Sequence, residues 1–91
     1  MKHSNPFASI DENQFDDVSI YPNPTNGLVN IDFGAVQSAR ISVININGQL
    51  VYQENISNQD NYSFEFDGIS GIYFLEIKNE DKRRIVKLIK E

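Results

Sequence analysis

One stretch, YPNPTNG at residues 21–27, fixes its own backbone more firmly than any other part of the chain. Its two prolines each hold φ at about −65° and favour an extended conformation in the residue before them. The Asn-Gly pair that follows tolerates positive φ, so the chain can reverse its direction there. The stretch therefore predicts a strand that ends at Tyr21, a rigid bend, and a turn into a second strand at Leu28. Taken alone, the stretch is better explained as an ordinary β-turn.

From Val18 onward, short apolar alternations are separated by turn residues, which is typical of an all-β domain. Segments such as 29–33 and 62–66 alternate apolar and polar residues, as half-buried strands do. Asn47-Gly48 joins two apolar runs and predicts a hairpin with a type I′ turn. We expect no helix and seven short strands, at about 18–21, 28–33, 41–46, 49–53, 62–66, 71–78 and 82–89.

A single flat sheet would leave one apolar face in water, so two packed layers are expected. Together they would bury one set of alternating residues: Val29, Ile31, Phe33, Phe64, Phe66, Tyr73, Leu75 and Ile77. The strand at 71–78 is apolar on both faces at its start, which indicates a central position. In the last strand either face could point inward. The predicted fold is an immunoglobulin-like antiparallel β-sandwich of about seven short strands.

The bulk composition fits one small domain, because the chain has only 91 residues. We divide it into a flexible polar leader, residues 1–17, and a β-sandwich domain, residues 18–91. A net charge of −5 argues against nucleic acid as a partner, and no apolar run approaches the roughly 20 residues needed for direct membrane insertion. Residues 1–7 have one positive charge but no apolar h-region, so we do not expect them to be a signal peptide. We interpret the chain as a domain excised from a longer protein, with a few residues near Met1 added for expression.

The sequence offers little for catalysis or for a metal. It has no cysteine, and its one histidine, His3, lies in the polar leader, so a nucleophile–histidine pair or a zinc site lacks its residues. The acidic pairs are adjacent in sequence, as in Glu80-Asp81, which we place at the tip of the last turn. Adjacent strand residues point to opposite faces and do not converge on a substrate. We therefore predict no enzyme activity, no cofactor and no metal site.

Three further landmarks follow YPNPTNG in order: Asn47-Gly48, Gly71-Ile72-Tyr73 and the basic, apolar end Arg84–Lys90. With this set, residues 18–90 resemble the type A C-terminal sorting domain of the type IX secretion system of Bacteroidetes. The resemblance implies an immunoglobulin-like fold and a sorting signal at the end of a larger cargo protein. It also implies passage from the periplasm through an outer-membrane translocon to the cell surface or the medium. A sortase-like peptidase would cleave the chain in the leader, before Val18.

The family motifs fall on specific positions of this chain. They are Tyr21, Pro22, Asn23, Pro24 and Gly27 in the bend, Gly48 in the hairpin, Gly71 and Tyr73 in the central strand, and Lys87, Ile89 and Lys90 in the closing strand. We expect the glycines to shape the fold. We expect a receptor to bind the last three residues, by strand addition to the terminal edge. The basic end is also explained as a solvated strand face whose charges discourage edge pairing.

Two other interpretations remain open at this point. The domain could be a carbohydrate-binding or adhesion module appended to an extracellular enzyme, with Tyr21, Tyr52, Tyr62 and Tyr73 as a stacking platform. However, alternation places Tyr62 and Tyr73 in the core, and the chain lacks tryptophan, the preferred stacking residue. An exposed, coplanar pair of tyrosines would favour this function. A purely structural spacer is the third possibility.

Overall fold

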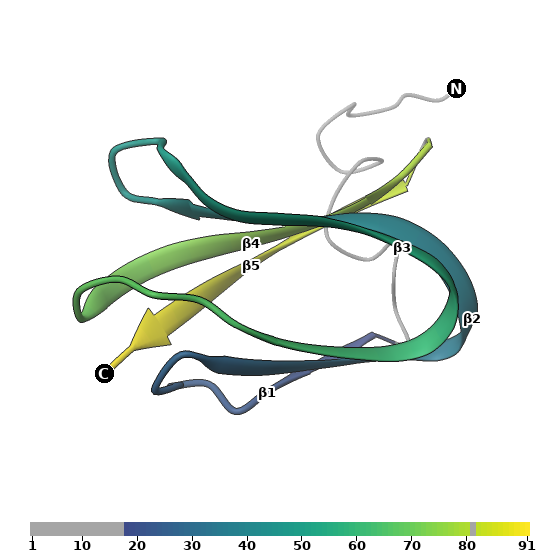
Figure 1. Cartoon of the computed structure of the whole chain (residues 1–91), viewed down its shortest axis with the longest axis horizontal. Coiled ribbons are helices and arrows are strands. Elements are labelled where there is room, and N and C mark those ends of the chain that lie inside the picture. Colours follow the sequence, from purple (N-terminus) through teal and green to yellow (C-terminus); the bar gives the residue numbers. More distant parts are fainter. Residues whose placement is uncertain (1–17, 81) are drawn as a thin grey trace, which may run out of the picture.

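The computed structural model describes residues 18–80 and 82–91. These residues form five strands and no helix (Figure 1): β1 (Ser19–Tyr21), β2 (Leu28–Asn45), β3 (Leu50–Glu65), β4 (Gly71–Asn79) and β5 (Lys82–Lys90). All named strand pairs are antiparallel, so the predicted all-β antiparallel class is confirmed. The predicted number of about seven short strands is wrong. Every predicted segment is extended, but β2 and β3 each join two of them into one long strand.

Both long strands bend at the same place. Residues 33–36 of β2 lie opposite Asp60 alone on β3, because Asp32 pairs with Asn61 and Gln37 with Gln59. Such extra residues disrupt the ladder locally and bend the strand. Gly34 takes a φ of 77° in this bend, and its N–H donates to Asp32 Oδ1 at 2.9 Å. The irregular pattern of residues 34–38 therefore marks a bend within one strand and not a loop between two.

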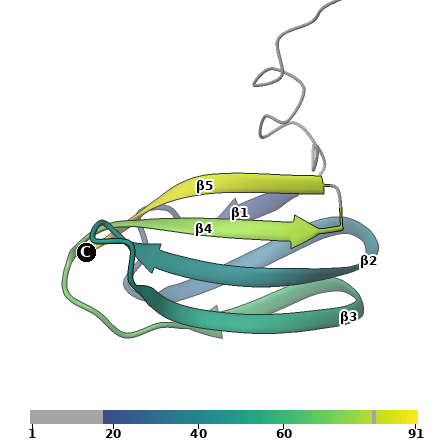
Figure 2. The ribbon, with the colours of Figure 1, turned by 90° about the horizontal axis from the view of Figure 1, so that it is seen from above.

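The bend folds one sheet into two layers. The pairing order is β1-β2-β4-β5, and β3 pairs with β2 along both of its halves. The first half of β2 lies with β1 in one layer, and the second half lies with β4 and β5 in the other (Figures 1 and 2). The space between the layers holds all eight residues predicted to be buried, together with Val18, Ala39, Ile41, Val43, Ile56 and Leu88.

The Asn47-Gly48 hairpin is confirmed, although its turn differs from the predicted type. Val43 pairs with Tyr52 and Ile44 with Leu50, with an irregularity between the two pairs. The Gly48 N–H donates to the Asn45 carbonyl at 3.0 Å, and only Gly48 of the Asn-Gly pair takes a positive φ, 83°. A type I′ turn would need positive φ at both central residues. The connection is instead a longer turn that closes on the Asn45 side chain, which accepts from the Asn47 and Gln49 N–H groups.

The structure shows the place of β4 in the sheet and the inward face of β5. β4 lies between β2 and β5, as its apolar start predicted. In β5, Leu88 is buried and Val86 half-buried, so these residues face the core while Ile85 and Ile89 face outward. Glu80 occupies the turn before β5, as expected, and Asp81 lies outside the described residues. Across the part of the chain that the structure describes, no helix is long and apolar enough to cross a membrane.

Candidate functional site

The YPNPTNG bend and the closing strand meet in space, although more than 60 residues separate them in the chain. The Thr25 N–H donates to the Ile89 carbonyl at 2.8 Å, and the Glu91 N–H donates to the Thr25 carbonyl at 2.8 Å. The bend thus adds a short parallel bridge to the edge of β5. The bend, which connects β1 and β2 of one layer, is thereby hydrogen-bonded to β5 of the other layer.

The Asn23 side chain extends this contact along β5. Its Nδ2 donates to the Lys87 carbonyl at 2.9 Å, and its Oδ1 accepts from the Ile89 N–H at 3.0 Å. An amide side chain here replaces the backbone of a neighbouring strand. The strand addition expected at this edge would therefore have to displace the bend, because the backbone groups that it needs already have partners.

Thr25 is a site residue that the sequence analysis did not select. Its side chain is 1% exposed. The Oγ1 atom accepts from the Gly27 N–H at 3.0 Å and donates to the Leu28 carbonyl. A short hydroxyl beside Asn-Gly can satisfy turn backbone in this way, which is the signal that could have identified it. Thr25 therefore holds the turn closed while its own backbone binds β5.

Gly27 permits a close approach of backbone to backbone. Its φ is 127°, and a Cβ atom there would lie 3.1 Å from the Phe66 carbonyl oxygen. The Phe66 N–H donates to the Gly27 carbonyl at 3.1 Å, so the two segments are paired at this point. The Lys90 side chain passes on the other side, with its Cε 3.6 Å from the same Cβ position. A larger residue at position 27 would push these neighbours apart.

Tyr73 fixes the loop between β3 and β4. Its ring is 4% exposed and contacts Phe66 edge-on at a centroid distance of 4.9 Å. Its hydroxyl donates to the Ile69 carbonyl at 2.7 Å and lies against Gly68, where a Cβ atom would overlap with it. Gly68 is thus a second residue that the site prediction missed. Gly71 and Gly48 have open space around them, so their positive φ values, 152° and 83°, are what favours glycine there.

The remaining motif residues are exposed. Tyr21 is 52% exposed, and Pro22 and Pro24 also lie at the surface, each after a cis peptide bond. Lys87 and Ile89 point outward from β5, whereas Lys90 is half-buried beside Gly27. The three residues that we expected a receptor to bind together therefore do not share one face.

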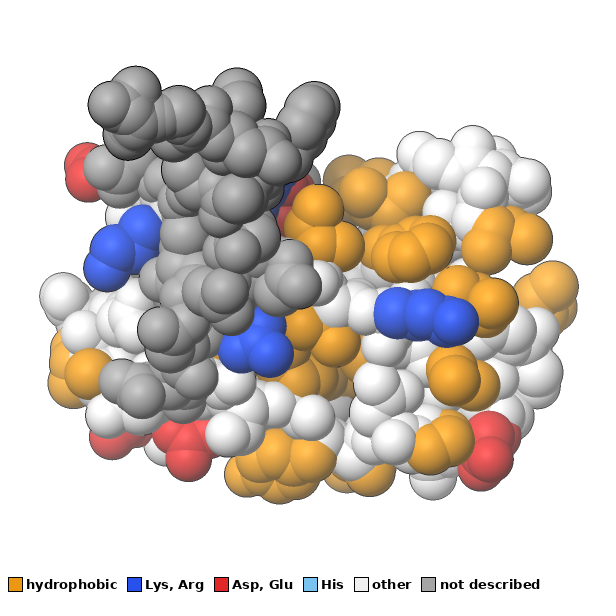
Figure 3. Space-filling view, turned by 180° about the vertical axis from the view of Figure 1, so that it is seen from behind, with side chains coloured by type: hydrophobic (Ala, Val, Ile, Leu, Met, Phe, Trp, Pro, Cys, Tyr) orange, Lys and Arg blue, Asp and Glu red, His pale blue; other side chains and the backbone are white. Residues whose placement is uncertain are grey.

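Lys87 and Ile89 belong to a larger surface, which we call the outer face: Ile44, Ile72, Phe74, Ile85, Lys87 and Ile89. The strand register places Phe74 between Ile44 and Lys87, and Ile72 opposite Ile89. Figure 2 looks onto the layer that carries this face, and Figure 3 shows hydrophobic and basic side chains gathered together on the side of the molecule where β5 lies. A hollow of about 400 Å³ opens between Ile44, Ile46, Phe74 and Ile85, and Glu76 also lines it.

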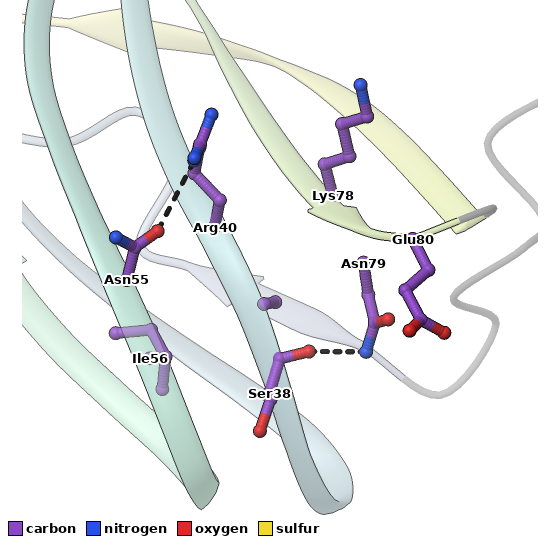
Figure 4. A pocket seen from close by; sticks show the side chains of 8 residues that line it. Ser38, Arg40, Asn55, Ile56, Lys78, Asn79 and Glu80 are labelled. Atoms are coloured by element: carbon purple, nitrogen blue, oxygen red, sulfur yellow. Dashed lines mark hydrogen bonds between the residues drawn. The ribbon is translucent and has the colours of Figure 1, made fainter.

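A second hollow, of about 420 Å³, lies at the opposite end of the same layer (Figure 4). Arg40 and Lys78 extend from neighbouring strands at its rim, Arg40 Nε donates to Asn55 Oδ1 at 3.3 Å, and the Asn79 amide donates to the Ser38 carbonyl. Among the described residues of its lining Glu80 is the one acid, so within this part of the chain no pair of carboxylates converges there. Among residues 18–80 and 82–91, no three potential metal ligands gather.

The tyrosines do not form a sugar-binding platform. Tyr73 is buried, and Tyr52 and Tyr62 are half-buried against Phe64, with Tyr52 stacked on it at 4.3 Å. The two hydroxyls share a hydrogen bond. Burial, with that bond, raises the pKa of the Tyr52 hydroxyl far above its ordinary value. Within the described part of the chain, Tyr21 alone is more than half exposed, so the exposed, coplanar pair of tyrosines that a stacking platform needs is missing there.

The site thus consists of the bend at residues 21–27, the edge of β5 that the bend covers, and the exposed, partly basic outer face. A family model for the secretion system C-terminal sorting domain matches residues 19–91. The chain belongs to this family. The resemblance found in the sequence is therefore confirmed: the domain is a C-terminal sorting signal, which serves export to the cell surface or the extracellular space. The sorting domain itself is not catalytic.

A curated relative is an ulvan lyase, NLR42, of Nonlabens ulvanivorans. It is 30% identical over 89 residues, and the alignment covers 89% of this chain. The chain spans only 16% of the length of that relative. The relative is thus a much larger protein, which is consistent with a sorting domain attached to cargo.

Proposed function

We propose that this domain is recognised by the outer-membrane translocon of the type IX secretion system and directs a larger cargo protein through it. The observation that carries this proposal is the contact of the bend with the closing strand. Asn23 and Thr25 bind the backbone of Lys87, Ile89 and Glu91, so motif positions from both ends of the domain form one structural unit. A partner could recognise this unit only when the whole domain is folded.

The motif residues would then act in two ways. Asn23, Gly27, Gly48, Gly71 and Tyr73 shape the backbone through close approaches, turns and hydrogen bonds. Lys87 and Ile89 are displayed outward and are available to a partner. Recognition by displayed side chains requires no reactive centre.

The cargo and the processing step belong to the same proposal. The relative is a lyase far longer than this chain, which supports a passenger protein joined to the domain. The passenger would cross the inner membrane first, and a sortase-like peptidase would remove the domain after export. Cleavage would fall within residues 1–17, which the sequence predicts to be a polar leader and which lie outside the described residues.

Export of a reporter tests this function. Residues 18–91 are fused behind a reporter that has a Sec signal peptide and are expressed in a Bacteroidetes host. We expect the reporter at the cell surface or in the medium, and in the periplasm when residues 87–91 are deleted, because the deletion removes both the displayed residues and the partners of Asn23 and Thr25. Retention of the intact fusion in the periplasm would contradict a sorting role. Equal export of both fusions would show that the closing strand is dispensable.

A further inference from the structure

We propose that the outer face of β2, β4 and β5 is the docking surface for the secretion machinery, and that it binds an apolar element which carries a carboxylate. This inference rests on the proposed function and specifies its partner. It assigns recognition to a face of the sheet and not to the terminal edge, because the bend occupies that edge at Thr25 and Asn23.

The outer face is more apolar than a solvated strand face. Ile72, Phe74, Ile85 and Ile89 are 38–48% exposed, and the β4–β5 register places them next to one another. A sheet with one side in water normally alternates apolar residues inward with polar residues outward. Contiguous apolar side chains at the surface indicate an interaction site more often than scattered ones do.

The face is also hollowed. The cavity of about 400 Å³ lies between the end of β2 and the neighbouring strands. Ile44, Ile46, Phe74 and Ile85 are its apolar lining, and Glu76 also lines it. A cavity with apolar walls is suited to an inserted aliphatic or aromatic side chain, which is how the central residues of protein interfaces bind. This hollow therefore supplies the anchoring point for the partner.

The charges beside the hollow specify the partner further. Because the charged residue in the lining is Glu76, the partner's carboxylate is assigned to Lys87, beside the hollow and not inside it. Lys87 lies across from Phe74 and between the outward residues Ile85 and Ile89. Along the same face, Arg40, Lys78 and Arg83 form one cross-strand row, and Glu76 forms an ion pair with Arg83 at 3.7 Å. Like charges directly opposite each other disfavour a sheet. A basic face on a chain of net charge −5 is thus complementary to an acidic partner and helps to orient it.

The same charges argue against a second copy of this chain as the occupant. A two-fold contact through this face would bring two copies of one patch together, and in each copy Lys87 and the three-residue basic row outnumber the acid Glu76. Burying like charges in one interface is costly. A partner with carboxylates beside its apolar residues avoids this cost.

Charge reversal in the exported fusion tests the inference. We expect Lys87→Glu and Ile85→Asp to reduce export about tenfold or more, the loss expected when a central interface residue is changed. Lys87→Arg should retain export because it keeps the charge. The matched controls are Lys82→Glu and Val36→Asp, which change an exposed lysine and an exposed valine outside the outer face. Thermal unfolding of the purified variants checks that each one folds.

The outcomes are distinguishable. If the unchanged fusion is not exported, both the proposed sorting function and this inference are contradicted. If the unchanged fusion and the Lys87→Glu fusion are exported equally well, the inference about the outer face is contradicted and the sorting function is supported. If Ile85→Asp does not fold, the comparison of Lys87→Glu with Lys87→Arg decides alone. If sedimentation shows a dimer that Lys87→Glu dissociates, the occupant is a second copy and the inference is overturned.

Discussion

The two sides of β5 differ in what they do. On the inner side, Leu88 is fully buried in the core, and along the edge the bend binds the backbone at Lys87, Ile89 and Glu91. On the outer side, Ile85, Lys87 and Ile89 face solvent. A single nine-residue strand therefore holds the two layers together and also displays a surface. The comparison shows that adjacent residues of one motif can have separate roles, one in stability and the other in recognition.

The largest effect on stability is expected from the inner side. Leu88→Ala should lower the free energy of unfolding by about 2–5 kcal/mol, because it leaves a cavity in the core. That is a large fraction of the total for a small domain. The neighbouring change Ile89→Ala should cost under about 1 kcal/mol, since that side chain is 41% exposed. Urea unfolding followed by circular dichroism measures the loss of unfolding free energy in both variants. Equal losses would contradict the difference between the inner and outer sides of β5.

A smaller effect is expected where the bend meets the edge. Asn23→Ala removes two hydrogen bonds to β5 at an exposed position and should cost about 1 kcal/mol. Hydrogen exchange of the Ile89 amide should accelerate, because that N–H loses its acceptor. Asn26→Ala is the control, since the Asn26 Oδ1 accepts from the nearby Leu28 N–H and not from β5 among the described residues. Unchanged exchange at Ile89 would mean that the bend does not hold this edge.

The smallest effect on stability at neutral pH is expected at Tyr52, which lies on β3 and not on β5. Burial raises the pKa of its hydroxyl in the folded state above the ordinary value of 10. Folding thus favours the neutral form of the hydroxyl. Its contribution to the free energy of unfolding is complete below pH 10 and is lost as the pH rises further. Tyr52→Phe should change stability little at pH 7 and make it less sensitive to pH above 10. An identical alkaline decline in both proteins would exclude Tyr52 as its cause.

Local patterns predicted most of the fold. The alternation in 29–33 and 62–66 identified the buried residues, since side-chain direction in a strand has a period of two. The same reasoning divided β2 and β3 into four strands, because residues 34–38 and 57–61 lack alternation. Pairing across the bulge at Gly34 keeps each strand continuous, and such pairing depends on residues distant in the chain.

The candidate site was predicted in part. The glycine and proline positions could be identified because each residue type limits its own backbone. Thr25 and Gly68 were missed, since their importance comes from Ile89 and Tyr73, which approach them only in the folded domain. The sequence analysis also placed Lys87, Ile89 and Lys90 on one binding surface. Local strand alternation around Leu88 is enough to separate Lys90 from the other two.

The amino-acid sequence by itself determined the all-β class, the family and eight of the core residues, because turn chemistry and periodicity act over a few neighbouring residues. The tertiary structure decided that one bent sheet forms both layers, that Asn23 and Thr25 close the edge of β5, and that Lys87 lies within an apolar face. These features depend on strand register and on contacts between distant segments, and both are fixed only when the whole chain packs.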